Sequence, residues 1–507
     1  MNFFRLLTPL LCLSLASCAQ SQPAPSPVSA PKIPFRALIV SGGPSPEYNQ
    51  YAIESNARYL EKLTARSRSQ RVLFADGNPK SRTISALQNS PQDDARRVLA
   101  WLLDAEAPAE KLIYRASGLK RIDGAATAQS IAQNVQKLAR EVKPGERALL
   151  YFTGHGSPGR KTRLSLSGVQ TGDDFENTTY AGWNDGEFSV KDLSRALRDW
   201  PSKTPLVLVM VQCHAGGFAN LIFEDANPRS AVLQRDFCGF FAATGERQAS
   251  GCTSEVDEVD YQDFTTHFFA ALSGVSRDGR RISGADFDKN GAVSLLEALA
   301  WTNVRDASID GPLCTSEAYL RSIWDADVEP DWVKTPYSTL AQGAVPWQRA
   351  ILDGLSLKLG LRGEDRVESA LQKQKLAAQA AENDDADLPS SVDGTKVGQR
   401  FEALERDVKR RFPGLSAPEK SARFQAAQTD ATRYLATRKG DLALLSGALK
   451  AWEAQSEAAA TREAACFRFV RAARTLWLEK RLKTQGTAAQ KAIFARIRAA
   501  ESRNPLR

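Results

Sequence analysis

The chain has 507 residues, of which 25% are charged and 42% hydrophobic, and a formal net charge of +8. This length allows two domains or more, and the modest charge is spread over interleaved acidic and basic residues. Because the chain contains only 3 histidines, a metal site made of several histidines is excluded. No nucleic-acid motif occurs, so nucleic acid is not an expected partner. Attraction to an anionic membrane surface or an acidic envelope polymer stays open.

The first residues have the pattern of an export signal. Arg5 carries the charge, and residues 6–15 form an apolar stretch that is too short to span a bilayer. The following Leu15-Ala16-Ser17-Cys18 resembles the bacterial lipobox. This resemblance implies that residues 1–17 are a lipoprotein signal peptide and that Cys18 becomes an acylated N-terminus, with palmitate among the added chains. No Asp follows Cys18, which by resemblance to lipoprotein sorting favours the outer membrane. The alternative is an ordinary secretory signal with a chance cysteine.

Residues 18–34 are rich in Pro, Ser and Ala, which predicts an extended tether between the membrane and the folded part. No later segment has the length and apolar character of a transmembrane helix. Export permits disulfides. Cys252 and Cys314 both lie in loop-like sequence and can pair, although the pairing among Cys238, Cys252 and Cys314 stays open. Cys466 is expected in the core of a helical region.

Strand and helix patterns alternate from residue 35 to about residue 335. The expected strands are residues 37–40, 71–75, 111–114 and 238–244, together with the apolar runs 148–156 and 206–214. The expected helices are residues 48–63, 93–103, 126–142, 189–200 and 261–272. This rhythm predicts an α/β fold, with a mostly parallel sheet flanked by helices and right-handed crossovers.

Two of the apolar runs end in residues that can do chemistry, His155 and Cys213. Open α/β sheets place their sites at the carboxyl ends of the strands, so the pair predicts a cysteine nucleophile with a histidine base. His214 follows Cys213 directly and should point away from the thiol. His267 falls in an expected helix and is expected to be structural. His155 is therefore the base that remains, and Cys213 should stay out of any disulfide.

The segments Tyr151-Phe152-Thr153-Gly154-His155-Gly156 and Val209-Met210-Val211-Gln212-Cys213-His214-Ala215-Gly216-Gly217 carry a family resemblance. They resemble the paired motifs of the caspase, legumain and gingipain superfamily of cysteine peptidases (clan CD), in particular bacterial legumain-like (C13-like) peptidases and metacaspases. The resemblance covers residues 35–335. It implies a caspase-like fold and an endopeptidase that acts on proteins or peptides through a thioester. It also implies an oxyanion hole formed by the backbone N–H groups of Gly156 and Cys213.

Two other functions stay open at this point. The first is a catalytically inactive envelope scaffold that binds a protein partner. The second is a transamidase or amidase that uses the same nucleophile on another bond. The geometry of His155 and Cys213 discriminates the scaffold from the enzymes, because an inactive chain has no need to bring the imidazole and the thiol together.

Substrate preference rests on weaker signals. The family places an acidic residue two positions before the cysteine, where this chain has Val211. Glu246, and Glu47 in the loop after the first strand, are substitute carboxylates for a basic P1 side chain. Further candidates in the same two regions are Asn49, Glu255, Asp257, Glu258 and Asp260. The alternative is that these acids are ordinary surface residues.

Residues 286–297 match the spacing of an EF-hand loop. The expected oxygen ligands are Asp286, Asp288, Asn290, the backbone carbonyl of Ala292, and Glu297. Gly291 allows the sharp turn, and Ser294 would act directly or through water. A helix is expected over residues 295–302, but none before the loop. The pattern predicts a single Ca²⁺ ion with a structural role, and a polar turn that caps the helix is the alternative.

The composition changes after residue 335. Residues 336–352 are interpreted as a linker and residues 353–507 as an all-α accessory domain, because Ala, Leu, Lys, Arg, Glu and Gln dominate there. The expected helices are residues 366–382, 397–411, 417–438, 441–460 and 462–482, with an acidic loop at 383–395. Apolar residues of the last helix share one face, as in a bundle. No catalytic group is expected there, and a partner of these helices is unknown.

Overall fold

The computed structural model describes residues 34–87, 93–103, 112–165, 168–258, 261–324, 330–382, 395–418 and 421–506. The expected signal peptide and almost all of the expected tether, including Cys18, lie outside the described residues. The same holds for Asp260 and for nearly all of the acidic loop expected at 383–395.

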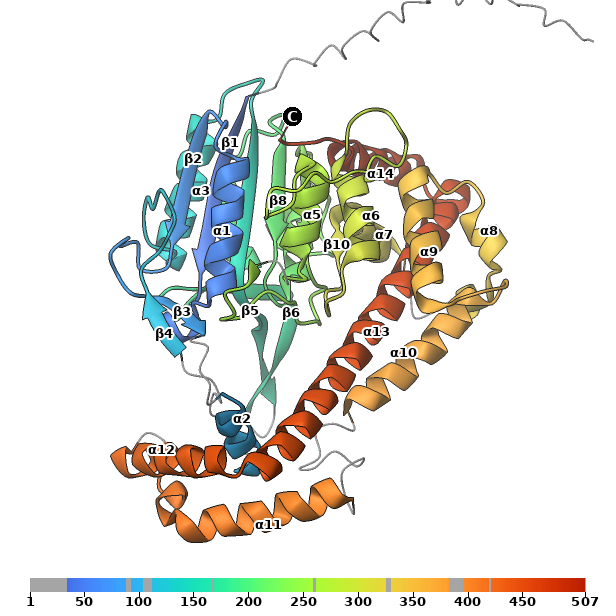
Figure 1. Cartoon of the computed structure of the whole chain (residues 1–507). Coiled ribbons are helices and arrows are strands. Elements are labelled where there is room, and N and C mark those ends of the chain that lie inside the picture. The colour runs from blue at the N-terminus through green and yellow to red at the C-terminus, as the bar shows by residue number, and fades with distance from the viewer. Residues whose placement is uncertain are drawn as a thin grey trace, which may run out of the picture.

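A mixed, mostly parallel sheet forms the centre of the molecule (Figure 1). Its strands, in spatial order, are β10 (Leu313–Cys314), β9 (Phe237–Phe241), β8 (Leu206–Met210), β5 (Arg147–Ser165), β1 (Phe35–Gly42) and β2 (Ser69–Phe74). All neighbouring pairs are parallel except β9 and β10. Every residue of β1, β8 and β9 is buried, as expected of apolar strands covered on both faces. The α/β prediction is confirmed.

Helices cover both faces of this sheet. The helices α1 (Tyr51–Leu63), α5 (Phe264–Ser273) and α6 (Leu295–Arg305) pack into one hydrophobic cluster. The opposite face is covered by α3 (Ala128–Glu141), α4 (Val190–Ala196), α7 (Thr315–Ile323) and the 3-10 turn η2 (Ala215–Ile222). Successive residues of β1 point to opposite clusters, because strand side chains alternate between faces: Leu38 belongs to the second cluster and Ile39 to the first.

The strand β5 leaves the parallel sheet close to His155. It pairs with β8 as far as Phe152, and from His155 onward it pairs antiparallel with β6 (Gly168–Gly182), which in turn pairs with β7 (Gly186–Ser189). The strand expected at 111–114 forms as β4 (Leu112–Arg115), but it pairs only with β3 (Ile84–Leu87) in a separate two-stranded sheet. The expectation that it extends the main sheet was therefore wrong.

The C-terminal region is helical. Its helices are α8 (Tyr337–Ala341), α9 (Pro346–Leu359), α10 (Arg366–Glu382), α11 (Lys396–Arg411), α12 (Ala422–Thr437), α13 (Lys439–Gln485) and α14 (Ala488–Glu501). Two helices expected at 441–460 and 462–482 are one continuous helix of 47 residues, α13. The stretch interpreted as a linker, 336–352, contains α8 and the start of α9. Short 3-10 turns occur at Pro46–Tyr48, Glu224–Ala226, Pro330–Lys334 and Pro413–Ser416.

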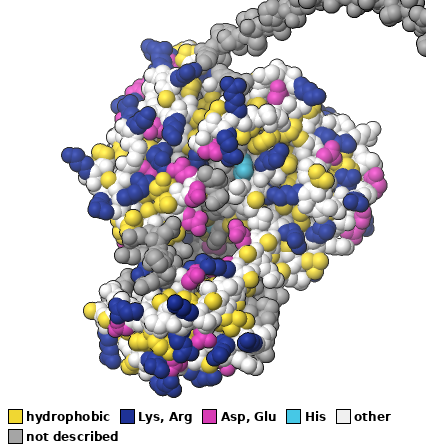
Figure 2. All heavy atoms as spheres, in the orientation of Figure 1, with side chains coloured by type: hydrophobic (Ala, Val, Ile, Leu, Met, Phe, Trp, Pro, Cys, Tyr) yellow, Lys and Arg dark blue, Asp and Glu magenta, His cyan; other side chains and the backbone are white. Residues whose placement is uncertain are grey.

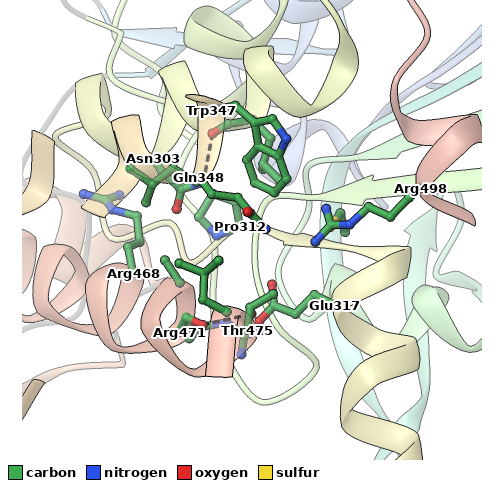
Figure 3. Close-up of a pocket in the computed structure, with 14 residues that line it drawn as sticks. Asn303, Pro312, Glu317, Trp347, Gln348, Arg468, Arg471, Thr475 and Arg498 are labelled. Carbon is green, nitrogen blue, oxygen red and sulfur yellow. Dashed lines mark hydrogen bonds and ion pairs between the residues drawn. The ribbon is translucent and has the colours of Figure 1, made fainter. Parts of the chain in front are cut away.

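The C-terminal helices are joined to the sheet through a buried polar junction around a small cavity (Figure 3). Arg471 of α13 donates to Glu317 of α7 at 2.7 Å, and Arg498 of α14 pairs with Glu479. Burial lowers the pKa of Arg471 to about 10, so its guanidinium stays charged at neutral pH. Ile497 and Ala500 of α14 pack into the two clusters on the sheet. The contacts therefore cross the boundary expected between the two domains.

A second contact between the regions lies at the far end of the molecule from the start of β1 (Figure 1). The helix α2 (Asp93–Leu102), which follows β3, packs against α11, α12 and α13 in a hydrophobic cluster of its own. Trp101 and Phe401 meet there with ring centroids 4.6 Å apart. Within the described ranges, no helix is both long and apolar enough to cross a bilayer.

Candidate active site

The strands that carry His155 and Cys213 are neighbours, and their carboxyl ends meet. Phe152 of β5 is paired with Met210 of β8, and the two candidate residues each lie three positions further along. Gly156 packs directly against the second motif, because a Cβ atom at this position would lie 2.2 Å from the carbonyl oxygen of Cys213. Only glycine permits this approach of the two backbones. The two predicted motifs therefore lie side by side.

The Cys213 side chain is partly buried and faces the loop of residues 244–252, which we call the thiol loop. Its Sγ lies 3.4 Å from the backbone N of Ala249 and 3.6 Å from the Ala249 carbonyl oxygen. Burial raises the pKa of the Cys213 thiol, while the N–H of Ala249 opposes the rise and the charge of Asp310 adds to it. The thiol is therefore neutral at neutral pH, and a base is needed to make it nucleophilic.

His155 is also partly buried, and its ring is held from the loop that precedes α1. The Nε2 atom lies 2.8 Å from Oε1 of Gln50, and the ring meets Tyr48 edge-on at 5.8 Å between centroids. Burial lowers the pKa of His155, and a hydrogen bond to the Tyr48 backbone partly opposes this. At neutral pH the imidazole is therefore neutral and able to take a proton. The sequence analysis missed Gln50, since a single Gln at a helix N-terminus carries no signal for such a role.

The two candidate residues do not contact each other through a hydrogen bond. Of the hydrogen bonds found among the described residues, none joins His155 to Cys213, because the imidazole is bound to Gln50 and the thiol to Ala249. In this arrangement the imidazole and the thiol are each held by another part of the chain.

Gln212, next to the thiol, is a second residue that the sequence analysis missed. Its side chain is 1% exposed, yet neither its amide nitrogen nor its amide oxygen has a hydrogen-bond partner among the described residues. Its Cγ lies close to Gly156, at the contact between the two motifs. Buried amides are normally satisfied, so this unpaired amide is an unusual feature at the contact between the two motifs.

The other two histidines each contact a different part of the chain. His214 has a left-handed backbone with φ 60°, its N–H donates to the carbonyl of Arg247, and its Nδ1 lies 2.7 Å from the carbonyl oxygen of Gly245. Its ring therefore contacts the thiol loop. His267 lies on α5 and contacts Gln262 at 3.1 Å.

The cysteines that the structure describes, Cys213, Cys238, Cys252, Cys314 and Cys466, are all free. Pairing of Cys252 with Cys314 was therefore wrong: the Cys252 Sγ lies 3.5 Å from the Gly154 carbonyl oxygen, and Cys314 contacts Ser316. The two residues sit on separate elements, which sequence spacing did not reveal. Cys466 is fully buried on α13, as expected.

The helix α13 holds the thiol loop from outside. Arg247 of the loop forms a bidentate ion pair with Glu463, in which Nη1 donates to Oε1 at 3.0 Å and Nη2 donates to Oε2 at 2.5 Å. The same guanidinium lies over the ring of Phe467, 4.2 Å from its centroid. Because the thiol contacts Ala249 in this loop, the position of the Cys213 partner depends on α13. The C-terminal helices thus form one support of the candidate site.

A buried carboxylate holds the same loop from inside. Asp310 accepts from the backbone N of Ser250 at 2.6 Å and from that of Phe264 at 3.0 Å. Burial and the nearby Asp306 raise the pKa of Asp310 well above its usual range. Arg468 of α13 donates to the Asp310 carbonyl at 3.0 Å. The loop is therefore fixed between the core and the helical region.

The candidate substrate carboxylates differ in their placement. Glu47 is exposed beside Tyr48, which contacts His155, and its Oε2 accepts from Ser45 at 2.7 Å. Glu246 is exposed on the thiol loop, and its charge partly opposes the lowering of the Arg471 pKa by burial, so it lies on the side of α13. Val211, where the family has an acid, is buried in the core. Glu47 is therefore the better placed of the two.

Two of the remaining polar candidates, Asn49 and Glu258, have partners within the chain. Asn49 is fully buried and links Gly43 to Thr83, so its role is structural. Glu258 is bound by Arg58 and Tyr51, and the Arg58 charge lowers the pKa of this carboxyl against the effect of burial. Neither group is available to a substrate in this arrangement.

The acidic loop lies before α6, away from the thiol. Carboxylate oxygens of Asp286, Asp288 and Glu297 come within 4.8 Å of one another. Glu297 is 1% exposed, and its Oε1 accepts from the backbone N of Phe287 and of Asp288. Its Oε2 accepts from Ser294, which closes a capping box on α6. This donor set of hard oxygens suits a calcium ion.

The turn within the acidic loop has the backbone expected of this motif. Gly291 has φ +89°, which favours glycine, and its N–H donates to Asp286 at 2.9 Å. Asn290 donates its N–H to Asp286 and Asp288. The loop therefore keeps its carboxylates together through its own N–H groups, and no helix precedes it in residues 274–294, as expected.

Comparison with known proteins adds little to this picture. No protein-family model matches the chain, and no curated protein matches it. Among solved structures, the crystal structure of a Geobacter sulfurreducens protein, a structural-genomics target, is 13% identical with a TM-score of 0.30. The alignment covers 56% of this chain and 92% of that chain. A similarity this low supports no statement about activity.

Proposed function

We propose that the chain is a cysteine-type endopeptidase with a caspase-like domain, in which Cys213 is the nucleophile and His155 the base. The observation that carries this proposal is the meeting of the two motifs at the carboxyl ends of adjacent parallel strands, with Gly156 against Cys213. This is the edge at which open α/β sheets place their sites. The substrate class is a protein or peptide.

The reaction follows from the chemistry of the two groups. After Cys213 turns from Ala249, His155 takes the thiol proton, and Sγ bonds to the peptide carbonyl carbon. The oxyanion is bound by the N–H groups of Gly156 and Cys213. The C–N bond breaks as His155 returns the proton to the amine. Water then attacks the thioester, giving the acid and restoring the thiol. The Tyr48 backbone accepts from the imidazole and stabilises its protonated form.

A screen of fluorogenic peptides varied at P1 tests this function. We expect cleavage by the wild-type chain, complete loss in Cys213→Ala, and retention in Cys252→Ala, which removes a neighbouring thiol. A preference for basic P1 residues that is lost in Glu47→Gln would assign that carboxylate. Cleavage that survives in Cys213→Ala contradicts the proposal.

The alternative of a catalytically inactive scaffold is favoured by one observation. Both side chains of the dyad are engaged elsewhere, His155 with Gln50 and Cys213 with Ala249. A scaffold would show no cleavage and no difference between Cys213→Ala and the wild type in binding a protein partner. The peptide screen therefore separates the two functions.

We also propose that the chain is an outer-membrane lipoprotein anchored through Cys18. The Leu15-Ala16-Ser17-Cys18 sequence and the Pro-, Ser- and Ala-rich tether support this. Two or three acyl chains would hold the protein firmly. Cys18→Ser should release it from membrane fractions, while Cys466→Ser should not. Persistence of Cys18→Ser in the membrane argues against acylation.

For the acidic loop we propose a structural calcium ion. Asp286, Asp288, Asn290, Glu297 and the carbonyl of Ala292 would hold it, and the ion would neutralise the repulsion among the carboxylates. The helix α6 starts at this loop and ends next to Asp306, so the ion would support the helix that precedes Asp310. The ion has no part in the chemistry of Cys213.

A further inference from the structure

A groove lies at the amino end of the central sheet, opposite to the candidate active site. It is lined by the first residues of β1 and β5, the turn after α1 and the end of α5, and its volume is about 770 Å³. The parallel strands β1, β5 and β8 run from this end of the sheet (Figure 1) to the end where Phe152 pairs with Met210, and His155 and Cys213 follow that pair.

Among the residues that the structure describes, the charged side chains that line the groove are all basic: Lys62, Arg66, Arg68 and Arg147. Lys62 and Arg66 are exposed, and Arg68 is half exposed while it pairs with Glu146. Arg147 is buried, and burial, with a smaller effect from the charge of Arg503, lowers its pKa. Figure 2 shows Lys and Arg side chains at this end of the molecule. An anionic ligand is favoured.

Apolar side chains complete the groove. Val275 is 37% exposed, Leu63 is partly buried, and Leu272 lies beneath them in the core. A rim of cations around exposed apolar surface fits the boundary between lipid headgroups and acyl chains better than it fits a small free anion.

The position of Pro34 indicates which partner lies near the groove. Pro34 lines the groove, so the preceding residues must leave from it. The segment from Cys18 to Pro34 spans at most about 55 Å when fully extended. A chain anchored at Cys18 therefore keeps this groove within that distance of the bilayer, at a high effective concentration.

We propose that this groove docks on the anionic phospholipid surface of the membrane that anchors the chain. The proposal rests on the lipid anchoring proposed above. Docking through the amino end of the sheet directs the carboxyl end, with Cys213, away from the bilayer. The candidate active site would then face soluble proteins or the polymer of the envelope, and not the membrane surface.

Vesicle binding tests the proposal without the lipid anchor. The chain from Ala19 onward keeps every described residue and lacks Cys18, so its binding is independent of acylation. We expect it to sediment with vesicles that contain phosphatidylglycerol and phosphatidylcholine, and much less with phosphatidylcholine alone. The change Lys62→Gln with Arg66→Gln and Arg68→Gln should lower the partition coefficient about 100-fold, at about 5-fold for each charge.

A matched control removes three charges from the opposite end, with Arg400→Gln, Arg406→Gln and Lys409→Gln on α11, and should bind like the wild type. If the groove variant melts lower, Lys62→Gln with Arg66→Gln replaces it, since both residues are exposed. Equal binding to both kinds of vesicle, no binding, or equal loss in the two triple variants overturns the proposal. Release of Cys18→Ser from membranes is a separate result that tests only the anchor.

Discussion

The polar side chains of the acidic loop and those of the candidate active site differ in how completely they are hydrogen-bonded. In the acidic loop, both oxygens of Glu297 accept hydrogen bonds, and the N–H groups of the turn point at its carboxylates. At the candidate active site, the Gln212 amide has no hydrogen-bond partner among the described residues. Burial lowers the pKa of His155 and raises the pKa of Cys213, so both groups are neutral at neutral pH. The first arrangement stabilises structure, whereas the second holds both candidate catalytic groups in their neutral forms.

Gly156→Ala should give the largest effect on the candidate active site. Its Cβ would lie 2.2 Å from the Cys213 carbonyl oxygen, so the two motifs must separate. We expect peptide cleavage to fall at least about 100-fold, since misplacement by about 1 Å has that effect. Chemical denaturation should show a loss of about 1–3 kcal/mol. Gly447→Ala, where nothing lies within 4 Å, is the control. Normal cleavage by Gly156→Ala would show that the close contact is not needed.

Calcium should stabilise the chain through the acidic loop alone. At a concentration 100 times its dissociation constant, the ion should add about 2.7 kcal/mol to the free energy of unfolding. Asp286→Ala combined with Glu297→Gln should abolish this gain, measured as the shift in melting temperature. Asp278→Asn changes an exposed acid outside the cluster and should leave the gain intact. The same melting temperature with and without calcium in the wild type would reduce the loop to a helix-capping turn.

Glu463→Gln should weaken the contact between α13 and the thiol loop while leaving His155 and Cys213 unchanged. The pair with Arg247 is partly buried, so its loss should cost about 1 kcal/mol of stability. We expect kcat for peptide cleavage to fall several-fold with KM changed less, because the loop positions the partner of the thiol. Glu457→Gln, on an exposed position of α13, serves as the control. An unchanged kcat would mean that the helical region does not influence the site.

The smallest expected effect is on the rate of Cys213 alkylation and on how this rate changes with pH. Burial disfavours the thiolate, so the folded-state pKa of Cys213 lies above that of an ordinary thiol. Iodoacetamide should therefore modify Cys213 more slowly than a small thiol at neutral pH, with a rate that rises at more alkaline pH. Because the folded-state pKa is raised, the free energy of unfolding decreases as the pH rises from the ordinary thiol pKa toward the folded-state pKa of Cys213. Mass spectrometry of the Cys213 peptide measures the rate. A midpoint below the ordinary value would indicate a preformed ion pair.

A feature could be predicted from the sequence when the residues that form it lie close together along the chain. The acidic loop is one contiguous stretch, and the apolar runs of β1, β5 and β8 identify buried strands directly, so both were predictable. Gln50, Asp310 and Glu463 act on the site from distant positions, and nothing nearby in the sequence marks them.

Two errors in the predicted elements have simple physical reasons. The polar strand β6 has no long apolar run, because it pairs with the part of β5 that extends beyond the core. The helix α13 was divided near residue 461, although no Gly or Pro interrupts residues 448–485. Its continuity carries Glu463 to the thiol loop and Arg468 to the buried junction on one rigid element.

The most direct test of the central claim is the rate at which a peptide-based, thiol-directed electrophile modifies Cys213, followed by mass spectrometry in the wild type and in His155→Ala. If His155 is the base, its removal should slow the modification about 100-fold or more, while His267→Ala should leave the rate unchanged. An equal rate in the wild type and in His155→Ala, or modification of Cys252 in place of Cys213, would contradict the account.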